Sequence, residues 1–537
     1  MKNRGADALL RVLRARGVTK IFTVSGNHVM PVFDAAIDAG IDLVHARHEA
    51  ATVHMADAYA RVSGQVGIAL VTGGPGHANA VSALYTARMA EAPIVLLSGH
   101  APQSQLGMGA FQEMAQADVA APLTKAAWSC GSADDVEHDA ARAIDIASAG
   151  RPGPVSLSVT SDALERTAAS NATATAFVEP PLEDDAAEAI LTHLQRAARP
   201  LVIVGPTSLT AQGSHDATAF EDATAIPVVG MESPRGIADP SLGAFGEMLA
   251  RADCILLLGK RLDFTLRFGK APALAADCLF LQIDAEDIEF ERSRRAVGER
   301  LVVTARTAAR PALQTLTAKA TAFDRGLHAA WRQDVRAAIA FRPTAWNGAS
   351  PRDRFHPLDA LRPLQPLLDS HPASVFVSDG GEFGQWAQAC LHAPNRVING
   401  MAGAIGSALS YAIGARCALP DVPIVAALGD GTFGFHASEV DTAARYALPF
   451  VAVVGNDARW NAEYQIQLRE YGAGRLIGCE LAPTRYDLVC AAFGGHGELV
   501  TNADAMTDAV SRAHRSRLPA CVNAMIDGVA APAIARG

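Results

Sequence analysis

Two polar residues stand directly after apolar runs near the C-terminal end of the sequence. Asp430, with a glycine on either side, follows the run 422–428, and Asn456 follows the run 450–454. We interpret each run as a buried strand of a parallel sheet. The carboxyl ends of such strands meet at one edge of the sheet, where ligands bind. A carboxylate and an amide oxygen there predict a Mg²⁺ site, because Mg²⁺ takes few protein ligands alongside phosphate oxygens.

Glu49 lies where a predicted strand, 42–46, meets a predicted helix, 50–61. Two interpretations of this carboxylate are open. It can simply complement the helix dipole from the first turn. It can also act as an acid or a base at the mouth of the sheet. The second role requires a poorly solvated site, in which the pKa of a carboxyl group rises toward neutrality.

Four segments carry further candidate residues. His28 follows the predicted strand 20–24, and Gln112 lies in the segment 109–113. A single histidine in a loop is more often incidental, but the edge that faces the active site favours a role in the reaction. The glycine-rich segment 72–76 predicts a tight turn. The segment 401–406 is open to two interpretations, a ligand-binding loop or the start of a helix of small residues.

Strand and helix patterns alternate along three segments of the chain. These are 1–167, 184–340 and 357–537, and the stretches 168–183 and 342–357 predict linkers. The pattern predicts three α/β domains, each with a doubly wound parallel sheet. The predicted strands are 20–24, 42–46, 66–71, 94–98, 155–159, 200–204, 226–229, 254–258, 279–283, 374–377, 422–428, 450–454, 497–500 and 520–525.

The composition excludes several classes of protein. The 537 residues are 50% hydrophobic and 19% charged, which is typical of a compact globular protein rather than a disordered one. A net charge of −10, without basic clusters, argues against nucleic acid as a partner. The arginine-interrupted N-terminal helix is no secretory signal, and the longest apolar run, 401–415, is too short to cross a membrane. Eight cysteines without a CxxC pair predict buried thiols in a cytoplasmic protein.

The unit around Asp430 and Asn456, the segment 48–61 and the order of motifs along the whole chain resemble thiamine diphosphate enzymes. The group resembled contains acetolactate synthase, benzaldehyde lyase and 2-hydroxyacyl-CoA lyase. The resemblance implies a pyrimidine-binding, a central and a diphosphate-binding domain. It implies that Asp430, Asn456 and the main-chain oxygen of Ala458 bind Mg²⁺. It also implies that Glu49 protonates the aminopyrimidine ring of the cofactor.

The same resemblance assigns the remaining site residues. Ile405 would lie under the bent cofactor, and the Gly403 carbonyl would accept a hydrogen bond from its 4′-amine. His28 and Gln112 would be catalytic residues on the substrate side, because benzaldehyde lyase has a histidine and a glutamine at matching positions. The other expected cofactor-binding residues are Gly26, Thr72, Pro75, Asn79, Gly429, Gly431 and Thr432.

The resemblance implies a carbon–carbon bond lyase or carboligase that acts on a 2-hydroxy-carbonyl compound or a 2-keto acid. An acetolactate synthase that uses pyruvate and a non-catalytic thiamine diphosphate-binding relative are the alternatives. The expected assembly is a homodimer or homotetramer with active sites at the subunit interface. The segment 260–269, with Arg261 and Arg267, is either a nucleotide contact or a solvated loop. Whether the central domain binds FAD, ADP or no nucleotide therefore stays open.

Overall fold

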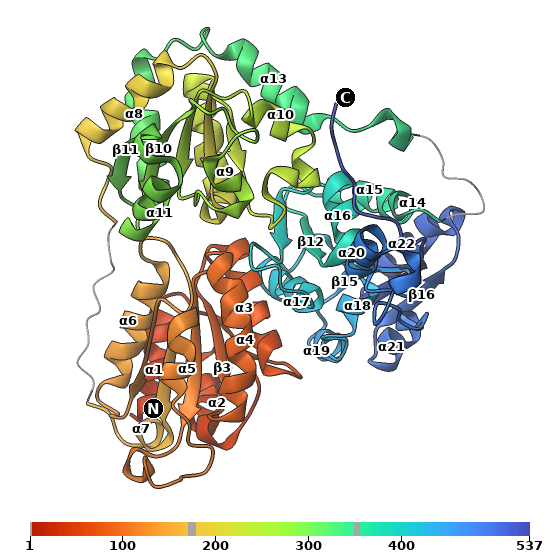
Figure 1. The fold of residues 1–537 in the computed structure, drawn as a ribbon. Helices are drawn as coiled ribbons and strands as arrows, with labels where there is room; N and C mark the ends of the chain where they lie inside the picture. The colour runs from red at the N-terminus through yellow and green to blue at the C-terminus, as the bar shows by residue number, and fades with distance from the viewer. Residues whose placement is uncertain (1–2, 170–178, 348–354, 537) are drawn as a thin grey trace.

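Three parallel β-sheets organise the residues that this computed structural model describes, 3–169, 179–347 and 355–536 (Figure 1). Each sheet belongs to one α/β domain, which confirms the predicted fold class. The predicted linkers fall largely on 170–178 and 348–354, which lie outside the described residues. The predicted domain boundaries stay predictions.

The N-terminal domain contains a six-stranded sheet with the strand order β2-β1-β3-β4-β6-β5. Its strands are β1 (Lys20–Thr23), β2 (Asp42–His45), β3 (Gly67–Val71), β4 (Ile94–His100), β5 (Ala126–Cys130) and β6 (Val155–Thr160). Its helices are α1 (Gly5–Ala15), α2 (Met30–Ala39), α3 (Glu49–Ser63), α4 (Pro75–Met89), α5 (Gln116–Ala120), α6 (Val136–Ser148) and α7 (Ser161–Glu165). All of the strand pairs are parallel, so the loops that carry His28, Glu49 and Thr72 leave the same edge of the sheet.

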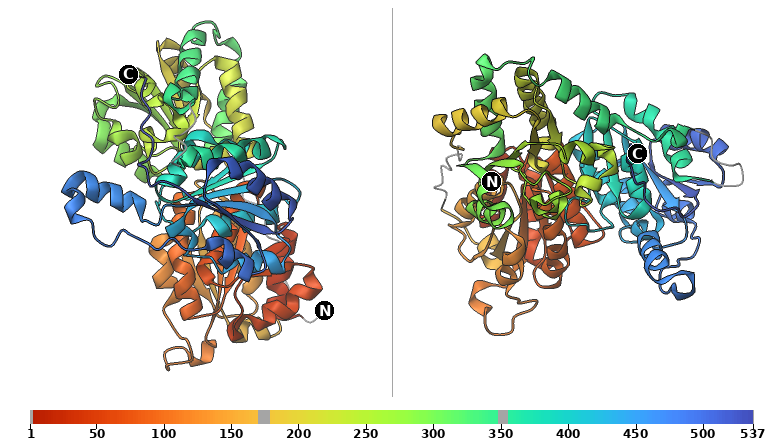
Figure 2. Two further views of the ribbon diagram at one scale, coloured as in Figure 1. Left: turned by 90° about the vertical axis from the view of Figure 1, so that its right-hand side faces the viewer. Right: turned by 45° about the horizontal axis from the view of Figure 1, so that its top comes forward.

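The central domain contains a five-stranded sheet with the order β11-β10-β9-β7-β8. Its strands are β7 (Pro200–Val204), β8 (Val228–Gly230), β9 (Cys254–Leu258), β10 (Leu279–Asp284) and β11 (Leu301–Arg306). Its helices are α8 (Asp184–Arg196), α9 (Ala211–Thr224), α10 (Phe245–Leu249), α11 (Asp287–Val297), α12 (Ala309–Lys319) and α13 (Ala329–Ala340). The left view of Figure 2 shows this domain above the other two. It contacts both, through the ion pairs of Arg151 with Asp284 and of Arg396 with Glu232.

The C-terminal domain repeats the strand order of the first, as β13-β12-β14-β15-β17-β16. Its strands are β12 (Val375–Asp379), β13 (Asn395–Ile398), β14 (Ile424–Gly429), β15 (Phe450–Asn456), β16 (His496–Val500) and β17 (Pro519–Met525). Its helices are α14 (Pro357–Leu361), α15 (Gln365–Asp369), α16 (Gly381–Cys390), α17 (Ala408–Ala418), α18 (Asp430–Phe433), α19 (Glu439–Arg445), α20 (Asn461–Tyr471), α21 (Tyr486–Ala492) and α22 (Met506–Arg515). The predicted likeness of the first and third segments is therefore present in their topology.

The strand predictions were incomplete at the edges of the sheets. β5, β11 and β13 were not predicted, and each is an edge strand. Edge strands bury one side at most, so their sequences lack the continuous apolar run that marks a central strand. The burial of β5 and β11 alternates or is partial, whereas β3, β7 and β9 are buried throughout. Among the described residues no helix has the length and apolar character needed to cross a membrane.

Helix α3 of the N-terminal domain packs against α17 of the C-terminal domain, and both contribute to one hydrophobic core (Figure 1). The hydroxyl of the fully buried Tyr411 donates to Asp57 Oδ2 at 2.9 Å, and Arg61 Nε lies 3.2 Å from Asp57 Oδ1. A Cβ atom added to Gly414 would lie 2.2 Å from the carbonyl oxygen of Met55. Small residues thus let the two helix backbones approach closely around a buried polar group.

We predict that Gly414→Ala destabilises the protein. Replacement of a helical glycine by alanine ordinarily stabilises by about 1 kcal/mol, but here the new methyl group would meet backbone atoms that cannot rotate away. Overpacking of this kind typically costs about 1–3 kcal/mol. Denaturant unfolding should show the loss. The control is Gly246→Ala in α10, where the added Cβ would lie 3.5 Å from its nearest neighbour and the helix should be unchanged or more stable. An equal effect of the two substitutions would contradict the packing argument.

Candidate active site

Glu49 is the first residue of α3, and the C-terminal domain holds the loop that precedes it. The carboxylate of Glu439 accepts hydrogen bonds from the backbone N–H groups of Arg47 and His48 at 3.1 Å each. His48 caps the helix, because its Nδ1 accepts from the backbone N–H of Ala50. The Asn79 side chain then donates to Glu49 Oε2 at 3.0 Å. Glu49 therefore sits at a helix start, as both interpretations require, and it has one of the expected cofactor residues as a hydrogen-bond partner.

The loop after β3 lies against the loop after β1. A Cβ at Gly26 would lie 2.3 Å from Thr72 Cβ, so this approach requires glycine. His28 Nδ1 and Thr72 Oγ1 are 3.0 Å apart. Helix α4 begins at Pro75, and Gly74 at its N-cap adopts a φ of 58°. The structure thus brings Gly26, His28, Thr72, Pro75, Asn79 and Glu49 to one edge of the first sheet.

Gln112 and His28 both lie beside this loop. The Cα–Cβ region of Gln112 covers Gly74, since a Cβ there would be 2.8 Å from Gln112 Cβ. Gln112 has a φ of 57°, and its buried Oε1 has no hydrogen-bond partner among the described residues. The His28 ring stacks on Phe111 with centroids 6.1 Å apart, and burial together with His100 lowers the pKa of His28. The imidazole is therefore neutral at neutral pH.

Gln116 was not singled out from the sequence, although it holds the glycine-rich loop in place. Its Oε1 accepts from the backbone N–H of Gly74 at 2.9 Å, and its amide donates to Ser158 and to the carbonyl of Gly99. A buried glutamine with three partners fixes a loop well. No local pattern in the sequence marks this residue, because its partners come from three separate loops and strands.

Asp430 and Asn456 end neighbouring parallel strands, as predicted. The register of β14 and β15 pairs Gly429 with Gly455, so the two following residues lie side by side. Asp430 is buried, and its Oδ2 has no partner among the described residues. Burial raises the pKa of Asp430 to about 6. Burial and the nearby Asp430 also raise the pKa of Asp457 to about 7. Arg459 offsets the rise at Asp457 only in part, so the two carboxylates repel each other.

The other two expected metal ligands are already held in place. Asn456 donates its amide protons to the carbonyl of Thr484 and to Asn523, which leaves Oδ1 with one weak bond, 3.3 Å from the Ala458 nitrogen. Ala458 has a φ of 54°, and its carbonyl oxygen accepts from Leu481 at 2.7 Å. A carbonyl oxygen has two lone pairs, so one remains for a metal. The described residues hold no group of three or more His, Cys, Asp or Glu side chains that could bind a metal by itself.

A cavity beside Asp430 suits a bound diphosphate with Mg²⁺. It is lined by the predicted residues Ile405, Gly429, Asp430, Gly431 and Thr432, and also by Gly380, Gly381 and Trp460. Helix α16 begins at Gly381 without a side-chain cap, so its free N–H groups face this region. Negative phosphate oxygens need such donors, and a divalent cation would offset both the phosphates and the unpartnered Asp430 oxygen. The residues present therefore fit a diphosphate–Mg²⁺ group.

The segment 401–406 is a loop, and α17 begins only at Ala408, so the alternative of a helix start is wrong. Asp379, at the end of β12, holds this loop: its Oδ2 accepts from the backbone N–H groups of Gly406 at 2.8 Å and Ala408 at 2.9 Å. His436 Nδ1 donates to the Gly406 carbonyl at 2.7 Å. The loop that carries Gly403 and Ile405 is thereby fixed, and Ile405 lines the cavity beside Asp430. Asp379 was missed, although it carries the same signal as Asp430, a carboxylate between an apolar strand and a glycine.

The two groups of predicted residues do not form one site within the chain. The cavity beside Asp430 is lined only by residues of the C-terminal domain, 380–463. Glu49, Asn79, Thr72 and His28 lie at the edge of the first sheet. The Glu49 carboxylate accepts a hydrogen bond from Asn79, within the N-terminal domain.

Three family descriptions match the chain. The N-terminal TPP binding domain of thiamine pyrophosphate enzymes matches residues 3–119, the central domain matches 187–312, and the C-terminal TPP binding domain matches 379–524. The three matches follow the order of the three sheets.

Similar proteins span the full length of the chain. A probable acetolactate synthase of Mycobacterium bovis is 30% identical, with 97% of this chain and 95% of that protein covered. The 2-hydroxyacyl-CoA lyase 2 of Homo sapiens is 29% identical, with 97% and 90% covered. A 2-hydroxyacyl-CoA lyase of Oryza sativa subsp. japonica is 28% identical, with 98% and 96% covered.

We predict that Asp379 makes the stability of the protein depend on pH. Burial raises the pKa of this carboxyl from 3.8 to about 6, so the folded protein holds the proton up to a higher pH than the unfolded chain does. The resulting stability is present below about pH 4 and is lost as the pH rises through 6. Asp379→Asn should abolish this loss, which is about 3 kcal/mol over the whole range at 1.36 kcal/mol per pKa unit and about 2 kcal/mol between pH 4.5 and pH 7.5.

Urea unfolding of wild type and variant at pH 4.5 and pH 7.5 measures this difference. Asp487→Asn is the control, because hydrogen bonds from Arg485 and Asn523 outweigh burial and lower the pKa of Asp487. Its stabilising effect is lost only as the pH falls below about 3.8, so Asp487→Asn should destabilise the protein equally at pH 4.5 and pH 7.5. The same pH dependence in wild type and Asp379→Asn would show that this carboxyl does not titrate with folding.

Proposed function

Because this chain belongs to the thiamine pyrophosphate enzyme family and is a thiamine diphosphate-dependent enzyme, we propose that it cleaves or forms a carbon–carbon bond without oxidation. The substrate is a 2-hydroxy-carbonyl compound or a 2-keto acid. The observation that carries the proposal is the assembly of Glu49, Thr72, His28 and Gln112 around one loop at the edge of the first sheet. A carboxyl group, a neutral imidazole and a free amide oxygen meet there, so protons can be held and exchanged beside a bound substrate.

When bound, thiamine diphosphate supplies the nucleophilic carbon and the electron sink for this chemistry. Asp430, Asn456 and the Ala458 carbonyl would hold Mg²⁺, and Gly429, Gly431 and Thr432 line the cavity for the diphosphate. The loop with Gly403 and Ile405 would support the rings of the cofactor, fixed in place by Asp379.

The chain's own acid–base groups have separate tasks. Glu49 would hold and transfer a proton at the aminopyrimidine ring, and Asn79 orients its carboxylate. His28 would exchange the proton of a substrate hydroxyl, because burial keeps its ring neutral at working pH. Gln112 would accept a hydrogen bond from the same hydroxyl through its unpartnered Oε1.

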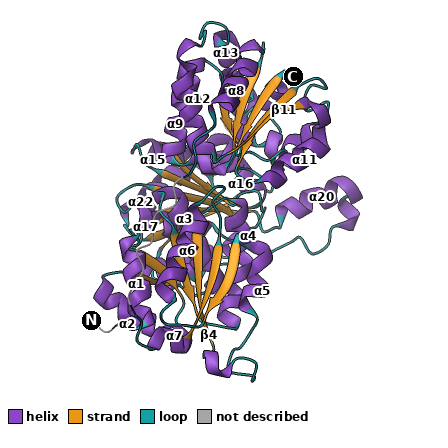
Figure 3. Cartoon of the chain, turned by 90° about the vertical axis from the view of Figure 1, so that its left-hand side faces the viewer, coloured by secondary structure: helices purple, strands orange, loops and turns teal. Residues whose placement is uncertain are grey.

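We further propose that two copies complete each site, in a homodimer or homotetramer. Two observations support this. The lining of the cavity beside Asp430 contains no residue of the N-terminal domain. Large apolar side chains are also exposed in both the N-terminal and the C-terminal domain. Met108 is 79% and Phe111 69% exposed, and α20 projects from the body with Ile466 and Tyr471 exposed (Figures 2 and 3). Packing of these side chains against a second copy of the chain would remove their apolar surface from water. Eight free cysteines support the cytoplasm as the compartment.

An acetolactate synthase that condenses pyruvate is the second candidate, favoured by the likeness to the mycobacterial protein. The two candidate functions differ in the substrate group that Phe111, His28 and Gln112 would contact. A neutral imidazole beside a free amide oxygen is suited to the hydroxyl of a 2-hydroxy-carbonyl compound, whereas pyruvate carries no such hydroxyl.

A substrate screen tests the proposal. The holoenzyme, supplied with thiamine diphosphate and Mg²⁺, is incubated with 2-hydroxy ketones, 2-hydroxyacyl-CoA compounds and 2-keto acids, and products are measured by mass spectrometry. We expect cleavage of a 2-hydroxy-carbonyl compound to an aldehyde and its loss in His28→Ala. Formation of acetolactate from pyruvate, with no cleavage of any 2-hydroxy compound, would establish the second candidate instead.

The roles of Glu49 and Asp430 are separated by two substitutions. Glu49→Gln should retain the cofactor but slow exchange of its C2 proton by about 10²–10⁴-fold, the usual cost of losing a positioned acid or base. Asp430→Ala should lose Mg²⁺-dependent cofactor binding, because it removes the charged ligand from a site that has few ligands. Calorimetry measures binding, and NMR of the bound cofactor measures exchange. C2 exchange at the wild-type rate in Glu49→Gln would remove Glu49 from its role, and undiminished binding by Asp430→Ala would refute the metal site.

A further inference from the structure

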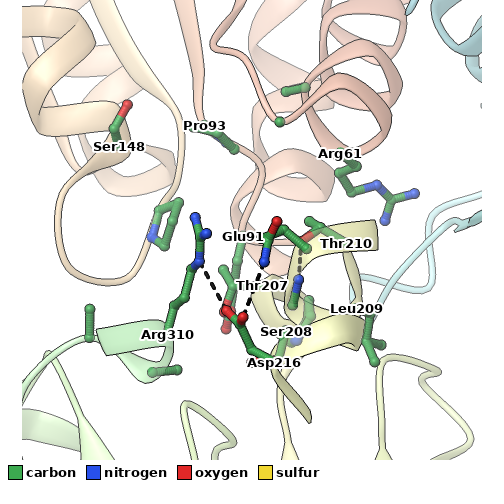
Figure 4. A pocket seen from close by; sticks show the side chains of 18 of the residues that line it. Arg61, Glu91, Pro93, Ser148, Thr207, Ser208, Leu209, Thr210, Asp216 and Arg310 are labelled. Carbon is green, nitrogen blue, oxygen red and sulfur yellow. Dashed lines mark hydrogen bonds and ion pairs between the residues drawn. The ribbon is translucent and has the colours of Figure 1, made fainter. Parts of the chain in front are cut away.

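Two cavities outside the proposed active site differ in the charges that line them. A cavity of about 550 Å³ lies between the N-terminal and central domains (Figure 4). Its lining carries groups of both signs, among them Arg61, Glu91, Asp216 and Arg310, so its charge favours neither an anion nor a cation. A smaller cavity in the C-terminal domain has a lining in which basic groups predominate.

The smaller cavity, of about 220 Å³, lies at the edge of the C-terminal sheet where the strands begin. Its walls come from the ends of α17 and α22, from the starts of β14 and β15, and from the segment after α15. Asp430 follows β14 at the opposite edge of the sheet, so this cavity is separate from the proposed active site. Four of its lining side chains are basic and one is acidic: His371, Arg416, His514, Arg517 and Asp421.

Arg416 is a buried charge in the wall of this cavity. Only 8% of the residue is exposed, yet it forms no ion pair with a described carboxylate. Its Nε donates to the Pro449 carbonyl at 2.7 Å and its Nη1 to the Pro420 carbonyl at 2.6 Å, so neutral oxygens hold the guanidinium in place. Its Nη2 has no hydrogen-bond partner among the described residues and is not enclosed by protein atoms. Because buried charges are normally paired, this nitrogen is the donor that an anion in the cavity would use.

Three further basic side chains line the same cavity. Arg517 is exposed and forms no ion pair with a described carboxylate. The Nδ1 atom of His371 accepts a hydrogen bond from the backbone N–H of Ala373 at 3.1 Å, so the neutral ring carries its proton on Nε2 as a donor. Burial, together with Arg517 and Arg416, lowers the pKa of His514. These basic groups therefore lie close enough to repel one another, and an anion among them would relieve the repulsion.

The one carboxylate of the lining does not neutralise these groups. Asp421 is exposed and forms no ion pair with Arg416 or Arg517. Burial and Arg517 lower the pKa of Arg416 to about 10, and Asp421 offsets this only in part. An organic cation would meet two guanidinium groups and no buried carboxylate here. The volume also lies below the range of about 300–1,000 Å³ for small-molecule sites, so a nucleotide is too large.

We propose that the smaller cavity binds a divalent oxyanion, either a tetrahedral inorganic ion or a short dicarboxylate. Its oxygens accept from Arg416 Nη2, from the Arg517 guanidinium and from His371 Nε2. Guanidinium groups form short, charge-assisted hydrogen bonds with such oxygens. The bound ion links the ends of α17 and α22 to the segment after α15. The site goes beyond the proposed reaction and does not depend on which carbonyl compound the enzyme uses.

Calorimetry with sulfate and with succinate tests the proposal. The full-length holoenzyme is used with saturating thiamine diphosphate and Mg²⁺, so that the probes do not enter the cavity beside Asp430. Sodium chloride at equal ionic strength is the control for screening. We expect one probe ion bound per chain; tighter binding of sulfate would identify a tetrahedral ion as the ligand, and tighter binding of succinate a dicarboxylate. Absence of saturable binding by both probes would overturn the proposal.

Two substitutions with opposite effects locate the ion, and both change exposed residues, so folding should be preserved. Arg517→Ala should weaken binding about tenfold or more, because it removes a charge-assisted hydrogen bond. Asp421→Asn should tighten binding about threefold or more, because it removes the carboxylate that repels the anion. Arg515→Ala is the matched control: it removes the same charge at the end of α22 but outside the lining, and it should bind within about twofold of wild type. Equal affinities of Arg517→Ala and Arg515→Ala, or affinity that Asp421→Asn leaves unchanged or weakens, would overturn the assignment of the site.

Discussion

The contact between α3 and α17 is the constraint on which both halves of the site depend. Glu49 begins α3, and the loop that holds Gly403 and Ile405 leads directly into α17. The buried Tyr411–Asp57–Arg61 group fixes the two helices relative to each other. A buried polar group of this kind is costly unless it is fully bonded, so it favours one arrangement of the helices over others. Glu439, which binds the backbone before Glu49, extends the same connection to the loop that follows Asp430.

Carboxylates at the ends of central parallel strands are a second recurring feature. Asp284 ends β10, Asp379 ends β12 and Asp430 follows β14, and burial raises the pKa of each to about 6. Their surroundings differ, and so do their roles. Asp379 accepts two backbone N–H groups and is structural, Asp284 pairs with Arg151, and Asp430 lines a cavity. Asp379 and Asp430 each have one oxygen without a partner among the described residues, so the position at the cavity, rather than the free oxygen, distinguishes the ligand site from the support.

The sequence predicted those elements and site residues that a local pattern marks. Central strands were found because they are continuous apolar runs, and Asp430, Asn456 and Glu49 were found because they follow such runs or begin a helix. The edge strands β5, β11 and β13 were missed because half of each faces solvent. Gln116 could not be found, since its importance lies in partners from distant segments, Gly74 and Ser158. The placing of Glu49 in the first domain and Asp430 in the third followed from the order of motifs and the resemblance.

The shared core of α3 and α17 has a consequence for synthesis. Roughly 350 residues separate the two helices, so at roughly 5–20 residues per second the ribosome needs tens of seconds to deliver the second after the first. During that time the face of α3 that will contact α17 has no partner within the nascent chain. This face carries the polar side chains of Asp57 and Arg61, which contact Tyr411 of α17 in the folded protein. Polar side chains on an otherwise apolar face reduce its tendency to aggregate before the last domain emerges.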